Sequence, residues 1–297
     1  MAGYFVLALA IPDAFGGSGL AFALAYLAIV SVHTALFTRA ASATVVTAIV
    51  RLAPWNLTSA LVVLVGGALG GTAQYVLWTF AAVFEWMTPI LRRGARGFAI
   101  GAAHFVERHG LVVIVAIGES VIAVGIGASH LAVDLPLVVA VTLGLALSAC
   151  LWWLYFGGSE ERAERALADA PPLVRAHAAL FGFGYAHMPI LLGIVTTAAA
   201  ERRGLEHPFD RLSWWNASLL AGGVALFLAG DVWFRSVLCI GRAHVRAVIT
   251  VLALAAVPLG AGVSAVAAIA ALVALLVTGI VAEARLDGPP PKEATCS

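Results

Sequence analysis

Residues 104 to 120 contain the densest group of side chains that could do chemistry. His104, Glu107 and Arg108 are spaced at i, i+3 and i+4, which places them on one face of a helix. Glu119 lies eleven residues after Arg108, so the two share that face to within about 20° but lie roughly 16 Å apart along the axis. Ser120 follows directly. Imidazole and carboxyl groups on one helix face can exchange protons, which makes this group a candidate site for acid–base work.

Glu119 interrupts an apolar run, so we expect it inside a membrane span. Its neighbours at i−3 and i+4 are Ala116 and Ala123, and this narrow face suits contact with another helix. An unpaired carboxylate there costs several kcal/mol, so Glu119 is expected to be protonated, paired or in contact with water. Each state is compatible with proton-coupled work. The alternatives are a structural hydrogen bond from Glu119, and an interfacial ion cluster for the preceding His–Glu–Arg group.

Other polar residues form a secondary set of candidates. Asp231 and Arg235 are spaced at i and i+4 and predict an ion pair near the inner face, with a functional role as the alternative. Glu85 lies within two turns of the expected cytoplasmic end of its helix, where snorkelling competes with function. His187 precedes Pro189 by two residues, a combination that suits a binding cavity as well as a hydrogen-bonded core histidine.

The motifs of soluble enzymes are absent from the sequence. It contains no P-loop, no dinucleotide-binding glycine motif after a strand and no nucleophile elbow. His104 and Glu107 form one pair of potential metal ligands, whereas di-metal sites in helix bundles need two such pairs and further carboxylates. We therefore assign no catalytic residue and expect neither a metal nor a cofactor.

The elements that must position these residues are membrane-spanning helices. Of 297 residues, 62% are hydrophobic and 11% charged, and mean hydropathy is +1.00, which predicts an all-α polytopic transmembrane bundle over residues 1–284. A net charge of +1 gives no basic surplus for nucleic acid. We expect about nine spans, at residues 19–37, 55–71, 72–91, 109–128, 134–157, 174–199, 214–238, 245–260 and 262–283. Residues 285–297 predict a disordered tail.

Shorter features complete this layout. Residues 40–50 are too few to cross and predict an interfacial helix. Gly70 with Gly71, and Pro258 with the glycines after it, predict tight turns. Residues 1–11 are apolar but fall short of a span, so either the start lies inside a longer gene or these residues form a partial N-terminal helix. Two Trp-Asn pairs, each followed by a Gly-Gly pair, suggest a weak inverted repeat, although helix packing alone also explains them.

The basic residues predict the orientation. If the loop after Phe37 is cytoplasmic, fourteen basic residues lie inside, Arg235 and Arg246 among them, and three lie outside. This is the positive-inside pattern of a bacterial inner-membrane protein, with its C-terminus in the cytoplasm.

The sequence also resembles a known family. The run His-Phe-Val-Glu-Arg-His-Gly-Leu at 104–111, followed by Gly-Glu-Ser-Val at 118–121, resembles the bacterial low temperature requirement A membrane-protein family. Segments 11–15, 185–189 and 220–230 are similar to it as well, so the resemblance covers nearly the whole chain. Members typically begin with an earlier span carrying an acidic Glu-Leu-Phe-Phe-Asp-type motif, which this sequence lacks. The resemblance implies an integral membrane protein without that first span, and it implies no biochemical activity.

Three functions remain open at this point. A transporter or permease for a small solute, coupled to protons through Glu119, fits many spans with a few intramembrane ionisable groups. An intramembrane enzyme acting on a lipid-soluble substrate would use His104, Glu107 and Glu119 as acid, base or ligand. The third is a non-catalytic membrane component that supports growth in the cold. The expected partners are the lipid bilayer and a small solute or proton, and the sequence fixes neither substrate nor oligomeric state.

Overall fold

The computed structural model of the chain describes residues 1–40, 43–91 and 101–286. This described part consists of helices joined by turns and contains no strand, as expected for an all-α protein. The chain divides into two compact units, Met1–Ala99 (unit 1) and Ile100–Ser297 (unit 2). Each unit has a hydrophobic core of its own.

Each expected span coincides with a helix or a run of helices. Eight segments of the described residues are long and apolar enough to cross a membrane: Gly19–Arg39, Ile49–Leu69, Ala102–Ala128, Leu135–Asp169, Pro172–Glu206, Trp214–Leu238, Ala243–Gly262 and Ala265–Leu286. The ninth expected span corresponds to α4 (Gly71–Leu91), which contains the polar residues Gln74 and Glu85 and is not among the eight. The protein is therefore a multi-pass helical membrane protein.

Unit 1 contains α1 (Ala2–Ala10), η1 (Ile11–Asp13), α2 (Gly19–Ala40), α3 (Ala43–Leu69) and α4 (Gly71–Leu91). The turn before α2 is held by Asp13, whose Oδ2 accepts hydrogen bonds from the Ser18 backbone N–H at 3.1 Å and hydroxyl at 3.3 Å. Gln74 Nε2 donates to the Ala14 carbonyl at 2.6 Å. The bond from Gln74 ties the turn to α4.

The interfacial helix expected over residues 40–50 is wrong. α3 continues from Ala43 to Leu69 with Pro54 inside it, because a membrane helix tolerates proline when other groups bond the freed backbone. The expected turn at Gly70 and Gly71 is confirmed, since both residues have positive φ (67° and 54°), which only glycine adopts without strain.

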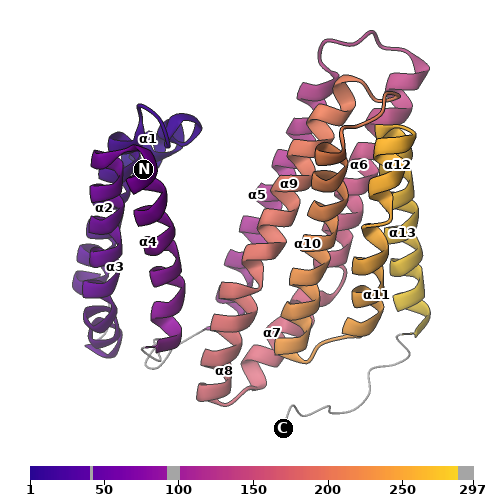
Figure 1. The fold of residues 1–297 in the computed structure, drawn as a ribbon. Helices are drawn as coiled ribbons and strands as arrows, with labels where there is room; N and C mark the ends of the chain where they lie inside the picture. The colour runs from indigo at the N-terminus through magenta and orange to yellow at the C-terminus, as the bar shows by residue number, and fades with distance from the viewer. Residues whose placement is uncertain (41–42, 92–100, 287–297) are drawn as a thin grey trace. The chain divides into compact units, whose positions relative to one another are not determined.

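Unit 2 consists of α5 (Ala102–Ala128), α6 (Leu135–Phe156), α7 (Ser159–Asp169), α8 (Pro172–Ala178), η2 (Ala179–Tyr185), α9 (His187–Glu206), α10 (Trp214–Leu238), α11 (Ala243–Ala253), α12 (Ala256–Gly262) and α13 (Ala265–Leu286). Within this bundle α7 and α8 lie at one end and α12 at the other (Figure 1). Two helices begin at conventional caps: Asp134 accepts from Leu137 N at 2.9 Å, and Ser213 accepts from Asn216 N at 3.1 Å.

Helices α9 and α10 approach each other closely through glycines. A Cβ on Gly223 would lie 2.8 Å from the Thr197 backbone nitrogen, and a Cβ on Gly230 would lie 2.8 Å from that of Ile190. The neighbouring Gly222 has no such contact within 4 Å. Close backbone approach through small residues is the usual packing of membrane helices, so it accounts for Gly223 and Gly230 without a repeat.

The turn expected at Pro258 and the glycines after it lies directly beyond these residues. Pro258 occupies the first turn of α12, where its missing N–H needs no partner, and the chain turns at Val263 and Ser264 instead. A second irregularity is η2, a π-helix of seven residues directly before α9. π-helical turns are rare and occur frequently at functional sites.

Candidate functional site

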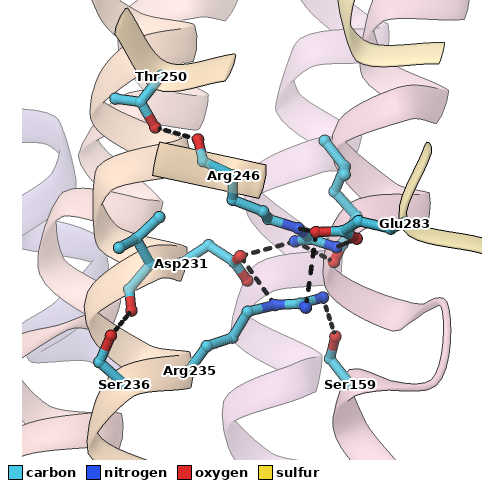
Figure 2. A network of polar contacts seen from close by, with 9 residues as sticks. Ser159, Asp231, Arg235, Ser236, Arg246, Thr250 and Glu283 are labelled. Carbon is cyan, nitrogen blue, oxygen red and sulfur yellow. Dashed lines mark hydrogen bonds and ion pairs between the residues drawn. The ribbon is translucent and has the colours of Figure 1, made fainter. Parts of the chain in front are cut away.

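Four charged side chains meet inside unit 2, from three different helices (Figure 2). Asp231 and Arg235 belong to α10, Arg246 to α11 and Glu283 to α13. Arg246 Nη1 donates to Asp231 Oδ2 at 2.6 Å, while its Nε and Nη2 bond the two Glu283 oxygens at 2.9 and 3.0 Å. Arg235 Nε lies 3.1 Å from Asp231 Oδ2, the ion pair expected from the i, i+4 spacing. We call these four residues the ionic network.

The ionic network is also bonded to the polar groups around it. Arg246 Nη1 donates to the Leu154 carbonyl at 2.8 Å, and Arg235 Nη2 donates to Ser159 Oγ at 2.8 Å. The network thus joins the end of α6 and the start of α7 to α10, α11 and α13. Its two acids and two arginines balance formally in charge.

Burial makes this network costly to disturb. Asp231 is fully buried, Arg235 and Arg246 are 2% and 3% exposed, and Glu283 is 9% exposed. Removing one partner from such a network leaves an uncompensated charge in a medium that solvates it poorly. Ionisable groups inside membrane segments are rare, face the bundle interior and mark substrate, ion or proton pathways. The ionic network meets that description.

His187 lies at the junction between η2 and α9. Its Nε2 is 2.7 Å from the Tyr155 hydroxyl of α6, and its Nδ1 is 3.0 Å from the Gly182 carbonyl of η2. The π-helical turn shifts the backbone hydrogen bonds, and the imidazole bonds one of its carbonyls. The rings of His109, Phe183 and Phe234 surround the imidazole, with centroids 5.1–5.3 Å away. Both ring nitrogens therefore have partners, and the rest of the surrounding consists of aromatic rings.

A buried carboxyl without a partner lies further along α9. Glu201 is 1% exposed, and neither of its oxygens has a hydrogen-bond partner among the described residues. Its Oε1 lies 3.6 Å from the position that a Cβ on Gly144 of α6 would occupy. The Val124 side chain of α5 lies 3.1 Å from that same position. Glu201 is therefore enclosed between α5, α6 and α9.

Two buried hydroxyls lie about one turn from Glu201. Ser120 precedes Val124 by four residues, and Ser148 follows Gly144 by four. Ser120 and Ser148 are 1% and 3% exposed, and neither hydroxyl has a partner in the described part of the chain. Hydroxyls in these helices usually bond the carbonyl four residues earlier, as Thr197 does at 2.8 Å. Unsatisfied buried groups call for an explanation, such as water or an ion.

The helix directions place all these groups along one line inside unit 2. α6 runs antiparallel to α9, because Tyr155 bonds His187 while Gly144 lies beside Glu201. Ser148 lies between those two positions on α6. At 1.5 Å per residue, the distance from Gly144 to Tyr155 is about 16 Å, close to half of a bilayer's hydrocarbon thickness. Leu154, whose carbonyl bonds Arg246, then continues the line to the ionic network.

The residues singled out first lie elsewhere. His104, Glu107 and Arg108 are exposed at the start of α5, where Arg108 Nε donates to His104 Nε2 at 2.8 Å and Glu107 lies 3.7 Å from His104. Glu119 is exposed on α5, and the described residues give it neither a hydrogen bond nor an ion pair. Glu119 was expected to face a neighbouring helix, but within unit 2 the next residue, Ser120, is the one that is buried.

Glu85 belongs to unit 1 and is half-buried on α4, with Oε2 enclosed and without a partner among the described residues. It lines a pocket between α2, α3 and α4. Across the described ranges, no three His, Cys, Asp or Glu side chains converge as metal ligands would.

Sequence reasoning missed several of these residues. Arg246 and Arg235 were counted among the basic residues on the cytoplasmic side, but both are buried within their helices, α11 and α10. Without these two arginines, twelve basic residues lie on the expected cytoplasmic side and three on the outside, so the positive-inside pattern persists. Glu201 and Glu283 carried a signal, because each is an acid near the end of an apolar run. Tyr155 carried none, since tyrosine is common near membrane interfaces.

Comparisons with known proteins agree with the motifs in the sequence. The model of a family described as "Bacterial low temperature requirement A protein (LtrA)" matches residues 1–281. The uncharacterized protein RA0937 of Rhizobium meliloti (strain 1021) is 33% identical over 251 residues, which cover 78% of this chain and 59% of that protein. The chain thus spans about three-fifths of the length of this curated relative. No solved structure matches.

Proposed function

The chain belongs to the bacterial low temperature requirement A family, and from this premise we propose that it is a proton-coupled carrier for a small solute. We place it in the bacterial inner membrane with its C-terminus in the cytoplasm, as the basic residues indicate. The observation that carries the proposal is the line of buried polar groups inside unit 2, from Glu201 to the ionic network. A protein that only fills the membrane has no need of such a line, because each buried polar group costs free energy.

Glu201 is the proposed proton-exchanging group. No titratable side chain of a packed helix faces it: α10 from Trp214 to Gly230 and α13 from Ala265 to Ala282 contain none. On α5, Glu119 is exposed, and the nearest titratable residues of α6 lie toward its far end. The charged neighbours on α9 itself, Arg202, Arg203 and Glu206, are exposed. A buried carboxyl without a charged neighbour changes its charge by binding or releasing a proton.

The serine hydroxyls and His187 are the proposed continuation of the proton path. Side chains in a helix lean toward its N-terminus, so Glu201 leans toward the level of Ser120 and Ser148. Successive polar groups of this path are one to two helix turns apart, which is longer than a hydrogen bond. We propose that water bridges these gaps when the carrier opens. Tyr155 and His187 then connect this path to the ionic network, which responds to a change of charge by rearranging its ion pairs.

The proposal is tested in vesicles that contain the purified protein and an internal pH dye. A panel of amines, amino acids, organic acids, sugars and nucleosides is added outside, and the internal pH is followed. We expect at least one solute to change the internal pH in a protein-dependent manner, and we expect Glu201→Gln to abolish the change. Glu206→Gln, an exposed acid on the same helix, is the matched control and should behave as wild type.

A different result would contradict the proposal. If Glu201→Gln moves protons with every active solute as the wild type does, Glu201 has no role in coupling. If the folded wild type moves neither protons nor any solute, the carrier function fails, and a partner that copurifies would favour the non-catalytic role instead.

A further inference from the structure

Unit 1 contains a pocket of about 280 Å³ that the proposed carrier function does not use. It is lined by one stripe from each of three helices: Phe22 and Tyr26 of α2, Ser59 and Val63 of α3, and Trp78, Ala81, Ala82, Glu85 and Trp86 of α4. The α4 residues are spaced at i, i+3, i+4, i+7 and i+8, so they share a single helix face. The two alanines leave the space that the larger side chains enclose.

The walls of the pocket are aromatic and its charge is a single carboxylate. Phe22, Tyr26, Trp78 and Trp86 supply four ring systems, and no Lys or Arg of the described residues lines the pocket. Glu85 Oε2 is buried without a hydrogen-bond partner among the described residues.

The small polar side chain of the lining, Ser59, donates to the Ala81 carbonyl at 3.3 Å and also hydrogen-bonds the Glu85 side chain. A ligand in the pocket therefore meets the faces of aromatic rings and one carboxylate that no basic side chain in the described part of the chain neutralises.

The central ring is held in place before any ligand arrives. Trp78 Nε1 donates to the Val63 carbonyl at 2.9 Å, and the ring packs against Phe15 and Phe22 with centroids 4.9 Å away in both cases. A ring fixed in this way loses little conformational entropy on binding. Its face is attractive to a cation, because the quadrupole of an aromatic ring is negative there.

We propose that this pocket binds a small organic monocation of the alkylammonium class. Methyl or methylene groups around the nitrogen contact the rings, and the positive charge lies opposite Glu85. Quaternary ammonium ions are bound in this way in aromatic cages. Anions are excluded by the carboxylate, and uncharged molecules of the same shape lack the electrostatic attraction. The proposal concerns binding to unit 1 and stands whether or not unit 2 couples transport to protons.

The test is equilibrium binding of labelled choline to the purified full chain in nanodiscs without phosphatidylcholine, with no gradient imposed. Unlabelled tetramethylammonium should compete, whereas dimethylbutanol, the uncharged carbon analogue of choline, should not. Glu85→Gln should weaken choline binding at least tenfold, and Tyr26→Leu should weaken it several-fold. Glu206→Gln and Phe80→Leu are matched controls outside the pocket, and both should keep the wild-type affinity. Melting curves confirm that each variant is folded.

The ammonium group could belong to a free solute or to a lipid headgroup. Repeating the titration in phosphatidylcholine nanodiscs separates the two sources, because a headgroup in the pocket would abolish binding of free choline there. The proposal is overturned if the folded wild type binds neither choline nor tetramethylammonium at millimolar concentration. It is equally overturned if dimethylbutanol competes as well as tetramethylammonium, a comparison that needs no variant to fold. Loss of proton coupling with choline binding intact would contradict only the carrier function.

Discussion

Arg246 Nη1 lies 2.6 Å from Asp231 Oδ2, although the two residues are fifteen positions apart and belong to different helices. The same guanidinium bonds both oxygens of Glu283, thirty-seven residues further along the chain. One arginine side chain thus connects α10, α11 and α13, and its bond to the Leu154 carbonyl adds α6.

Breaking this network should destabilise the fold. Arg246→Met leaves Asp231 and Glu283 with Arg235 as the remaining cation of the network, and we expect a loss of about 3–5 kcal/mol in the free energy of unfolding. Detergent-induced unfolding of the purified protein measures it. Adding Glu283→Met to Arg246→Met should cost less than the two single losses combined, because both members of one ion pair are then absent.

The exposed His104–Glu107 pair is the natural control for that experiment. Both side chains are about two-thirds exposed, so Glu107→Gln should change stability by less than about 1 kcal/mol. A loss from Arg246→Met as small as that of Glu107→Gln would show that the network contributes nothing beyond surface ion pairing.

Adjacent glycines on α10 should differ sharply when substituted. Gly223→Ala would place a Cβ 2.8 Å from the Thr197 backbone nitrogen, which forces α9 and α10 apart and should cost about 1–3 kcal/mol. Gly222→Ala meets nothing within 4 Å and removes only the entropy cost of glycine in a helix, so it should be neutral or slightly stabilising. Melting temperatures of the two variants compare them directly. Equal melting temperatures would mean that α9 and α10 are not in such close contact.

Most of the fold could be predicted from the sequence because each span is a local property. Apolar length sets where a helix crosses, and this placed α10 at residues 214–238, the bounds that the structure shows. The wrongly predicted helix ends also have local causes. The expected bounds placed a helix end before residue 55 and a turn at Pro258, but Pro54 lies within a membrane helix and Pro258 in a first turn.

The candidate site could be predicted only in part, because it depends on which helix faces meet. The spacing of Asp231 and Arg235 indicated an ion pair, but no spacing links Arg246 to Glu283. The sequence also did not show which of Glu119 and Ser120 faces the neighbouring helices. A rotation of about 100° between consecutive helix residues decides which one faces the bundle, and the flanking alanines did not determine it. Hydrophobic periodicity is weak here because a membrane helix is apolar on all sides.

The central claim, that Glu201 exchanges a proton inside the bundle, is tested most directly by infrared difference spectroscopy of the carboxyl C=O band while the pH is changed. We expect reconstituted wild-type protein to show a band that changes with pH, and we expect this band to disappear in Glu201→Gln and to persist in Glu206→Gln. Coincident difference spectra of the wild type and Glu201→Gln, with both proteins folded, would contradict it.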